Sequence, residues 1–409
     1  MTTTAKAGEP VGNSAPRGRS HGRRVLAACG LAHFTHDGFS DTIYLLLPVW
    51  AESFGLSHAQ VGILKTVFSG SLASSQLPAG LLAERWGARW VLVISTLVVG
   101  LAFMALGLAG GFASLAVLLC CAGLASGAQH TLSSTLVAEA YREGRLRAAL
   151  GTYNFTGDLG KVAAPVLVAG GIALMGWRAS SLALGAFGCV VGIGLFIALK
   201  RLGTGDAPRG KPTSTRGFRF GDWGVTDRAG FRLLAAIGML DGAVRTGFLT
   251  FLPFLLIAKG AGVGTVGLAL ALTLGGGAAG KLACGFLAER IGVTRTVVLT
   301  ELATGAGILA LLAVPLVGAM MLLPLVGLAL NGTSSALYGT VPEFAAPGRQ
   351  SRIFGLFYTL TIGASAAAPV LCGLLSDLAG VPVTLAVVAV AALAPIPLCP
   401  LLARSLRST

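Results

Sequence analysis

The first apolar stretch of the chain carries four ionisable side chains close together. His33, Asp37 and Asp41 are spaced four residues apart, so a helix places them on one face, with His36 beside them. A charged side chain at the centre of a bilayer costs roughly 3 kcal/mol or more, so such residues persist where they face a cavity or one another. A carboxylate there can bind and release a proton, and histidine titrates near neutral pH. The stretch therefore predicts proton binding, with Asp37, near its middle, as the first candidate.

Asp241 occupies the equivalent place in the second half of the chain and is the second candidate. The predicted proton-coupling residues are Asp37, Asp241, His33, His36 and Asp41. For the two histidines, hydrogen-bonded packing is an equally open interpretation.

Acids and bases also recur at helical spacing in the later apolar stretches. Asp158 and Lys161 are three residues apart, and Asp241 and Arg245 are four apart. They could be ion pairs that neutralise each other in the membrane, or parts of a binding site. Arginine binds carboxylate or phosphate with two parallel hydrogen bonds, so a cavity with several cations suits an organic anion. The predicted substrate-binding residues are Arg245, Lys161, Asp158, His130, Lys281, Asn331 and Tyr338. Hydrogen bonding between helices is the alternative role for the neutral members.

The composition predicts that these residues lie in membrane-spanning segments. The 409 residues are 54% hydrophobic and 11% charged, with a mean hydropathy of +0.81, whereas soluble domains carry about 25% charged residues. We expect an all-α membrane protein of twelve spans in two six-helix bundles, at residues 25–52, 59–83, 88–110, 113–138, 149–173, 178–199, 231–257, 263–288, 294–316, 318–341, 352–377 and 380–403. The predicted domains are a disordered cytoplasmic tail at 1–24, an N-terminal bundle at 25–199, a cytoplasmic linker at 200–230 and a C-terminal bundle at 231–404.

The net charge of +14 indicates orientation rather than nucleic-acid binding, because the basic residues lie in short loops between apolar spans. Most of the 30 Lys and Arg fall on one side, which predicts that both termini are cytoplasmic. Arg23 and Arg24 lack an apolar region before Cys29, so a cleaved signal is not expected. No pair of the seven cysteines has CxxC spacing, which argues against a zinc site or a disulfide framework.

The chain repeats itself with an offset of about 204 residues. Gly62 and Gly80 match Gly267 and Gly285, and Ala-Pro at Pro165 recurs at Pro369. Six spans per repeat is an even number, so the two halves share one orientation and are related by an axis along the membrane normal.

Two loops at matching places carry a glycine, an acid, a base, a second glycine and a further base. They read Gly80, Glu84, Arg85, Gly87 and Arg89, and again Gly285, Glu289, Arg290, Gly292 and Arg295. The pattern resembles the signature loop of the major facilitator superfamily, with glutamate in place of the usual aspartate. That resemblance implies a conformational latch between the halves on the cytoplasmic side.

The fifth span is similar to a glycine–proline motif often seen in exporters of that superfamily, with Ala-Pro in place of Gly-Pro. Gly157, Gly160 and Pro165, with Pro369 in the repeat, are predicted to pack helices closely. Within the superfamily the chain resembles the fosmidomycin-resistance branch, at residues 32–37, Pro48, residues 56–62, residues 74–80 and residues 130–134. This resemblance implies proton-driven efflux of a drug or metabolite.

No nucleotide-binding loop, metalloprotease helix or nucleophile elbow is present, so we expect no enzyme, no catalytic residues, no cofactor and no metal. The leading hypothesis is a proton-coupled antiporter that exports a small drug-like molecule or metabolite by alternating access. A symporter that imports a small organic anion is the alternative, and a transport-inactive membrane sensor is the alternative of another class. The expected partners are a small solute, protons and the lipid bilayer, with no nucleic acid, for a monomer in a bacterial-type inner membrane.

Overall fold

The computed structural model describes residues 19–141, 145–206, 224–346 and 350–408, and these residues are almost entirely helical. The helices of the first half are α1 (Arg19–Phe54), α2 (His58–Trp86), α3 (Ala88–Leu106), α4 (Phe112–Ala140) and α5 (Leu146–Leu202). Those of the second half are α6 (Arg228–Ala258), α7 (Val263–Ile291), α8 (Val293–Ala313), α9 (Leu316–Thr340), α10 (Gln350–Ala391) and α11 (Cys399–Ser408). Two short 3₁₀ helices, η1 (Val341–Phe344) and η2 (Ile396–Leu398), follow α9 and α10.

The two longest helices, α5 and α10, are each folded back on themselves at a glycine. Gly176 in α5 has φ 79° and Gly380 in α10 has φ 85°, a region that only glycine enters without strain. The two glycines occupy equivalent places in the repeat, so each half makes the same reversal between its fifth and sixth passes.

Eight described helices are long and apolar enough to cross a bilayer. Two of these eight, α5 and the stretch through α10 and α11, cross twice because of the glycine reversals. The helices α1 and α2 are long enough as well, but their charged and polar side chains lower their hydropathy. Together they form twelve helical passes, six in each half.

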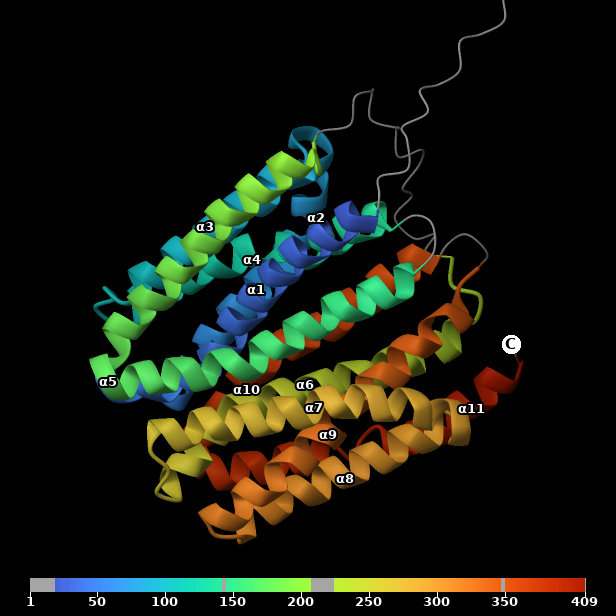
Figure 1. The fold of residues 1–409 in the computed structure, drawn as a ribbon. Helices are drawn as coiled ribbons and strands as arrows, with labels where there is room; N and C mark the ends of the chain where they lie inside the picture. Colours follow the sequence, from blue (N-terminus) through green and yellow to red (C-terminus); the bar gives the residue numbers. More distant parts are fainter. Residues whose placement is uncertain (1–18, 142–144, 207–223, 347–349, 409) are drawn as a thin grey trace, which may run out of the picture.

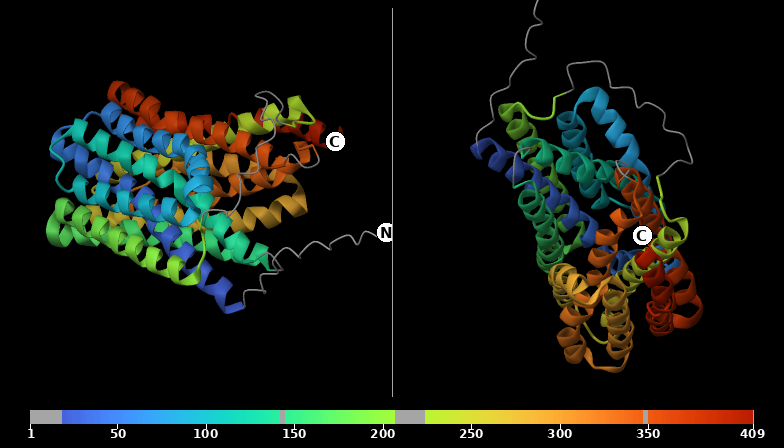
Figure 2. Two further views of the ribbon diagram at one scale, coloured as in Figure 1. Left: turned by 90° about the horizontal axis from the view of Figure 1, so that it is seen from above. Right: turned by 90° about the vertical axis from the view of Figure 1, so that its right-hand side faces the viewer.

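The helices gather into two bundles, α1–α5 and α6–α11, which Figure 1 shows as the blue-to-green and the yellow-to-red parts of the ribbon. The bundles converge at the end where α5 reverses and diverge toward the end where α1 begins and the chain finishes (Figures 1 and 2). We call these the distal end and the terminus end.

Small residues allow the two halves to touch near the distal end. A Cβ atom on Gly62 of α2 would overlap the backbone of Pro369 in α10, and one on Gly267 of α7 would lie 2.9 Å from the carbonyl oxygen of Pro165 in α5. Near the terminus end, Gly80 and Gly285 have nothing within 4 Å of such an atom. The structure is thus closed at its distal end and parted at its terminus end.

The predicted element boundaries hold to within a few residues, with three differences. Helix α1 begins at Arg19 rather than at residue 25, and α5 continues to Leu202. The predicted last span, 380–403, is interrupted, because α10 ends at Ala391 and η2 precedes α11. Residues 1–18 of the predicted tail and 207–223 of the predicted linker lie outside the described part of the chain.

Candidate functional site

Asp37 lies in the middle of α1 and contacts three basic side chains from three helices. Its Oδ2 atom is 3.2 Å from Nε2 of His33 and 3.1 Å from Nζ of Lys161, and its Oδ1 atom is 3.4 Å from Nε2 of His130. The Asp37 side chain is only 5% exposed. The predicted His33, Asp37, His130 and Lys161 therefore form one cluster in the N-terminal half.

A hydrogen bond of His33 shows which of its ring nitrogens carries a hydrogen. Nδ1 of His33 lies 2.9 Å from the carbonyl oxygen of Tyr153, which can only accept, so Nδ1 carries a hydrogen. In neutral histidine Nε2 then has a bare lone pair facing Oδ2 of Asp37. A hydrogen bond between these atoms requires one additional proton, and the two side chains are placed to share it.

The absence of a side chain at Gly157 makes this approach possible. A Cβ atom there would lie 2.5 Å from Nε2 of His33 and 2.7 Å from Oδ2 of Asp37. At Gly160 such an atom would overlap the backbone of Phe34. Gly157 and Gly160, which were predicted to pack helices closely, thus allow α5 to pack directly against α1 at His33 and Asp37.

An ion-pair chain continues from this cluster into the other half. Asp158 lies 3.4 Å from Lys161 on the same helix and 2.7 Å from Nζ of Lys281 on α7. The predicted pair of Asp158 and Lys161 therefore forms, and it extends across the interface.

In the C-terminal half, Asp241, Arg245 and Tyr338 line a small cleft with Ser334 and Thr361. No ion pair joins Asp241 to Arg245 in the described structure, although the two interact electrostatically over a longer distance. The predicted pair at this spacing is thus not a close contact, although both side chains line the same cleft. Arg245 is a half-buried guanidinium that forms no ion pair with any described residue.

Two tyrosines connect the acid cluster with this cleft. Tyr358 on α10 interacts electrostatically with Lys161, Asp37 and Arg245. Tyr44 on α1 interacts electrostatically with Arg245 on α6. The predicted residues of both halves therefore lie close enough to interact electrostatically across the interface.

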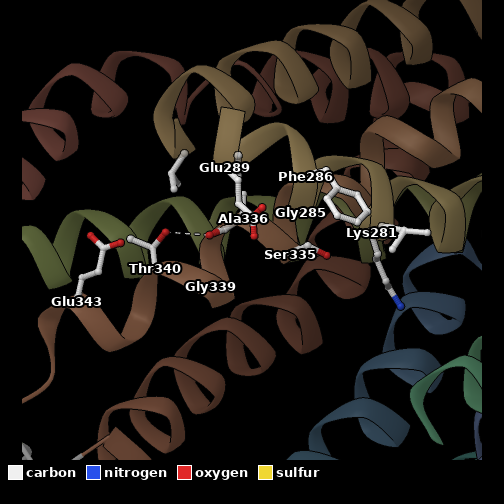
Figure 3. A pocket seen from close by; sticks show the side chains of 12 residues that line it. Lys281, Gly285, Phe286, Glu289, Ser335, Ala336, Gly339, Thr340 and Glu343 are labelled. Atoms are coloured by element: carbon white, nitrogen blue, oxygen red, sulfur yellow. Dashed lines mark hydrogen bonds between the residues drawn. The ribbon is translucent and has the colours of Figure 1, made fainter. Parts of the chain in front are cut away.

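A larger cavity of about 520 Å³ opens toward the terminus end between α7 and α9. Figure 3 shows Glu343 at one end of it and Lys281 at the other, where the lysine points toward the helices of the N-terminal half. Glu289 and Gly285 of the second signature loop also line the cavity (Figure 3). An anion that entered from the terminus end would meet Lys281 at its inner end.

Three other predicted site residues do not belong to the cluster around Asp37. Nε2 of His36 is 3.0 Å from Oγ1 of Thr96 on α3, directed away from His33. Asp41 is half-buried and interacts electrostatically with Lys161 and with Lys65, whose Nζ lies 3.4 Å from the Ser40 carbonyl oxygen. Asn331 donates to the Gly327 carbonyl oxygen and packs against Gly277, as expected for polar contact between helices.

The acidic and basic residues of the two signature loops are exposed at the terminus end. Glu84, Arg85, Glu289, Arg290 and Arg295 form no ion pair with any residue in the described ranges. Arg89 differs, because it pairs with Asp206 at 2.5 Å. Gly87 and Gly292 occupy the same place in both loops, with φ of 88° and 87°.

Asp377 and Glu301 are not among the predicted functional residues. Asp377 lies near the distal end of α10, and its carboxylate accepts from the backbone N–H groups of His58 and Ala59 in the other half, at 2.8 and 2.9 Å. Glu301 is fully buried within α8. Each lies inside an apolar segment, and a complete survey of acids in the spans would have found both.

His33, Asp37 and His130 offer ligand atoms within 4.8 Å of one another, a set that could hold a metal ion. Lys161 already places its ammonium group 3.1 Å from the carboxylate of this set. The observed arrangement is that of an acid neutralised by side-chain bases.

Residues 29–255 match the sequence model of the Major Facilitator Superfamily. The chain is 27% identical over 265 residues to the "Probable sulfoacetate transporter SauU" of Cupriavidus necator, which covers 61% of this chain and 60% of that protein. It is 24% identical over 146 residues to the "Probable L-galactonate transporter" of Escherichia coli (36% and 32% covered), and 27% identical over 177 residues to the 4-hydroxybenzoate transporter PcaK of Pseudomonas aeruginosa (43% and 39%). The chain thus spans less than two thirds of the length of each of these relatives.

The fold is similar to that of a bacterial homologue of the human lysosomal transporter Spinster in an inward-facing, unoccupied conformation. The TM-score is 0.81 at 16% identity, covering 96% of this chain and 98% of the other. The nucleoside transporter NupG is similar with a TM-score of 0.73 at 14% identity, covering 91% and 98%. The predicted all-helical membrane fold of twelve spans is thereby confirmed. The family match over more than half of the chain and the twelve-pass architecture lead to one conclusion: this protein belongs to the major facilitator superfamily.

Proposed function

We propose that this protein is a secondary active transporter that moves a small organic anion together with protons by alternating access. The observation that carries the proposal is Arg245, a half-buried guanidinium that faces a cleft without an ion-pair partner among the described residues. Lys161 and Lys281 are each paired with an acid, so Arg245 is the cation of this group that is free to bind a carboxylate or sulfonate.

Proton coupling is supported by the His33–Asp37 contact. This pair is placed to share one more proton than neutral histidine and ionised aspartate carry together. Asp37 also pairs with Lys161, so loss or gain of that proton changes the charge balance of the chain that reaches Lys281.

The direction of coupling follows from electrostatics. An anion bound at Arg245 raises the local negative charge, and a proton bound nearby lowers it, so each favours the binding of the other. Cooperative binding of anion and proton suits symport, in which both move the same way. The three curated relatives are described as transporters of sulfoacetate, L-galactonate and 4-hydroxybenzoate, all of them organic anions. Export through the fosmidomycin-resistance branch stays a prediction from the sequence.

The basic residues of the loops gather at the terminus end, and this asymmetry supports our assignment of that end to the cytoplasm of a bacterial-type inner membrane. In that orientation the structure is closed to the outside and parted toward the cytoplasm. The similar Spinster homologue is described as inward-facing, which supports the same assignment.

The proposal is tested by uptake into proteoliposomes under an imposed pH gradient, with sulfoacetate, L-galactonate and 4-hydroxybenzoate as probes. We expect an inward-directed proton gradient to drive accumulation of at least one probe. Accumulation driven by the opposite gradient would establish antiport, and binding without flux would establish a sensor.

The role of Arg245 is tested by Arg245→Gln. Losing a charge-assisted contact worth about 2 kcal/mol should weaken the apparent affinity for the anion about thirtyfold. Arg232→Gln is the matched control, because Arg232 is exposed and lies near the start of the same helix, α6. This substitution should leave the affinity for the anion unchanged. Equal effects of the two substitutions would remove Arg245 from the binding site.

A further inference from the structure

His58 is a titratable side chain for which the proposed transport site has no role. It is the first residue of α2, at the distal end. The side chains of His58 and of Asp377 across the interface are 31% and 34% exposed, so water reaches both. Histidine changes its charge between about pH 5 and 8. A proton from the aqueous phase at the distal end can therefore charge the ring without passing through the protein.

The ring of His58 contacts the opposite half of the molecule. Nδ1 lies 3.0 Å from Oγ of Ser376 and 3.8 Å from Oδ1 of Asp377, both on α10. The ring also packs edge-to-face against Phe254 and Phe251 of α6, with centroids 5.1 and 6.0 Å away. These four partners all belong to the C-terminal half, whereas His58 belongs to the N-terminal half. A change in the charge of the ring therefore acts on the interface between the halves.

Asp377 supplies the negative charge that a protonated ring meets. Its two carboxylate oxygens accept from the backbone N–H groups of His58 and Ala59, at 2.8 and 2.9 Å, which favours the ionised carboxylate. Among the described contacts of the ring, the groups from α6 are neutral aromatic rings, and Ser376 of α10 is neutral as well. The protonated ring is thus attracted to α10, and no positive charge among these contacts opposes it.

Ser376 keeps its contact with the ring in both protonation states. A hydroxyl group can donate to the bare Nδ1 of a neutral ring, and it can accept from the N–H of a charged one. The residue is 3% exposed, so this hydroxyl lies buried at the interface. Protonation of His58 therefore adds the attraction to Asp377 without the loss of this hydrogen bond.

The repeat lacks this pair on the opposite flank. The residues that match His58 and Asp377 are Val263, at the start of α7, and Ala173 in α5. Neither side chain can titrate. The pair is therefore a feature of the α2–α10 flank and not a consequence of the repeated fold.

We infer that His58 is a proton-binding site that favours closure of the distal end: a proton taken from the water there charges the ring, which then attracts Asp377 of the opposite half. When the distal end parts, the charged ring loses this partner. Protonation and closure therefore favour each other, because such coupling is reciprocal. The stabilisation of the closed end is present at low pH and is lost as the pH rises and the ring releases its proton. The inference depends on the contact across the distal end, and not on the proposed solute or its coupling.

The distance between spin labels at Ser53 and Ala258 tests this inference in the full-length protein without its seven native cysteines. Both residues are exposed, at matching points of the repeat near the distal ends of α1 and α6. A half-exposed ion pair shifts an equilibrium by at most about fivefold. We expect the ratio of closed to open molecules to fall about two- to fivefold between about pH 5 and 8.

His58→Gln isolates the contribution of the ring, because glutamine is polar but does not titrate in this range. We expect most of the change with pH to disappear in this variant. A change with pH equal to that of the protein with His58 would overturn the inference.

Asp377→Asn tests the electrostatic attraction separately. Asparagine keeps the shape of the side chain and removes the charge that the protonated ring meets, so the change with pH should shrink as it does in His58→Gln. An undiminished change in folded Asp377→Asn would show that this attraction does not close the distal end, and the inference would be wrong.

Gly62→Ala covers the case in which the open molecules are too few to measure. A Cβ atom at Gly62 would overlap the backbone of Pro369 in the closed state, so this substitution raises the population of open molecules and leaves the ring of His58 in place. The same two- to fivefold change is expected in this background, and adding His58→Gln should remove it. A ratio that stays constant with pH in Gly62→Ala would overturn the inference.

Discussion

For single residues such as Asp37, helical spacing predicted some of the contacts and missed others. Helical spacing alone predicted that His33 and Asp37 share a face, and their atoms meet at 3.2 Å. The same spacing did not yield an ion pair between Asp241 and Arg245, because helical spacing sets which face two residues share but not the rotamers of their long side chains. His130 and Lys281 reach the acids only through tertiary packing, which is why the sequence could nominate them but could not pair them.

Asp37→Asn should abolish uphill transport while leaving exchange partly active. Asparagine fills the same volume but cannot take up the proton shared with His33, so the driving force is lost and the pathway stays. Asp41→Asn is the control on the same helix face, because Asp41 forms no ion pair in the described structure, and its effect should be much smaller. Uphill accumulation of the anion by the Asp37→Asn protein would refute the coupling role of Asp37.

At the scale of elements, the start of α2 is held by a residue from the opposite half. Asp377 caps its first two backbone N–H groups, Ser376 contacts Nδ1 of His58 at 3.0 Å, and the ring of His58 packs against Phe254. A helix N-terminus favours a negative partner. The sequence predicted the spans and the glycine repeat, but an inter-half cap depends on which ends meet, and no local pattern carries that information.

Asp377→Asn should weaken the closed distal end. Asparagine removes the negative charge and one of the two acceptor oxygens, which together contribute about 1 kcal/mol, so the ratio of closed to open molecules should fall about fivefold. A cysteine placed at Gln60, near the start of α2, measures this ratio through its reactivity with a thiol reagent. Asp227→Asn is the matched control, since Asp227 caps α6 at 2.9 Å within one half; it should leave the accessibility unchanged, and equal changes would contradict the gate.

On the scale of the whole molecule, the sequence predicts the number of passes but not the conformation. Composition and the repeat were sufficient to predict twelve passes in two bundles, since hydrophobic length and glycine spacing are properties of the chain itself. The conformation adopted was not predictable, because the signature loops permit both pairing and separation. Here they are separated, with Glu84 and Glu289 exposed at the terminus end.

Removing both latch acids, by Glu84→Gln with Glu289→Gln, should favour the conformation described here. The terminus end would lose the contacts that hold it shut in the opposite state. Spin labels are placed at Leu81 and Leu282 in a protein without its seven native cysteines. In the double variant, the fraction of molecules with the longer distance between the labels should be larger than in the protein with both glutamates. Glu52→Gln, an exposed acid near the distal end, serves as the control. An unchanged distance distribution in the double variant would argue against a latch.

The contact between Asp158 and Lys281 has a consequence for the path of the motion. It joins α5 to α7 at 2.7 Å, whereas the repeat places Ile362 of α10 and Gln76 of α2 at the matching points of the opposite seam. Opposite charges therefore hold the α5–α7 flank beside the Asp37 cluster, whereas the α2–α10 flank is held at the distal end, where Asp377 contacts His58 and Ala59. The α2–α10 contact must break when the distal end opens, whereas the Asp158–Lys281 contact can persist, so the α5–α7 flank should act as the hinge.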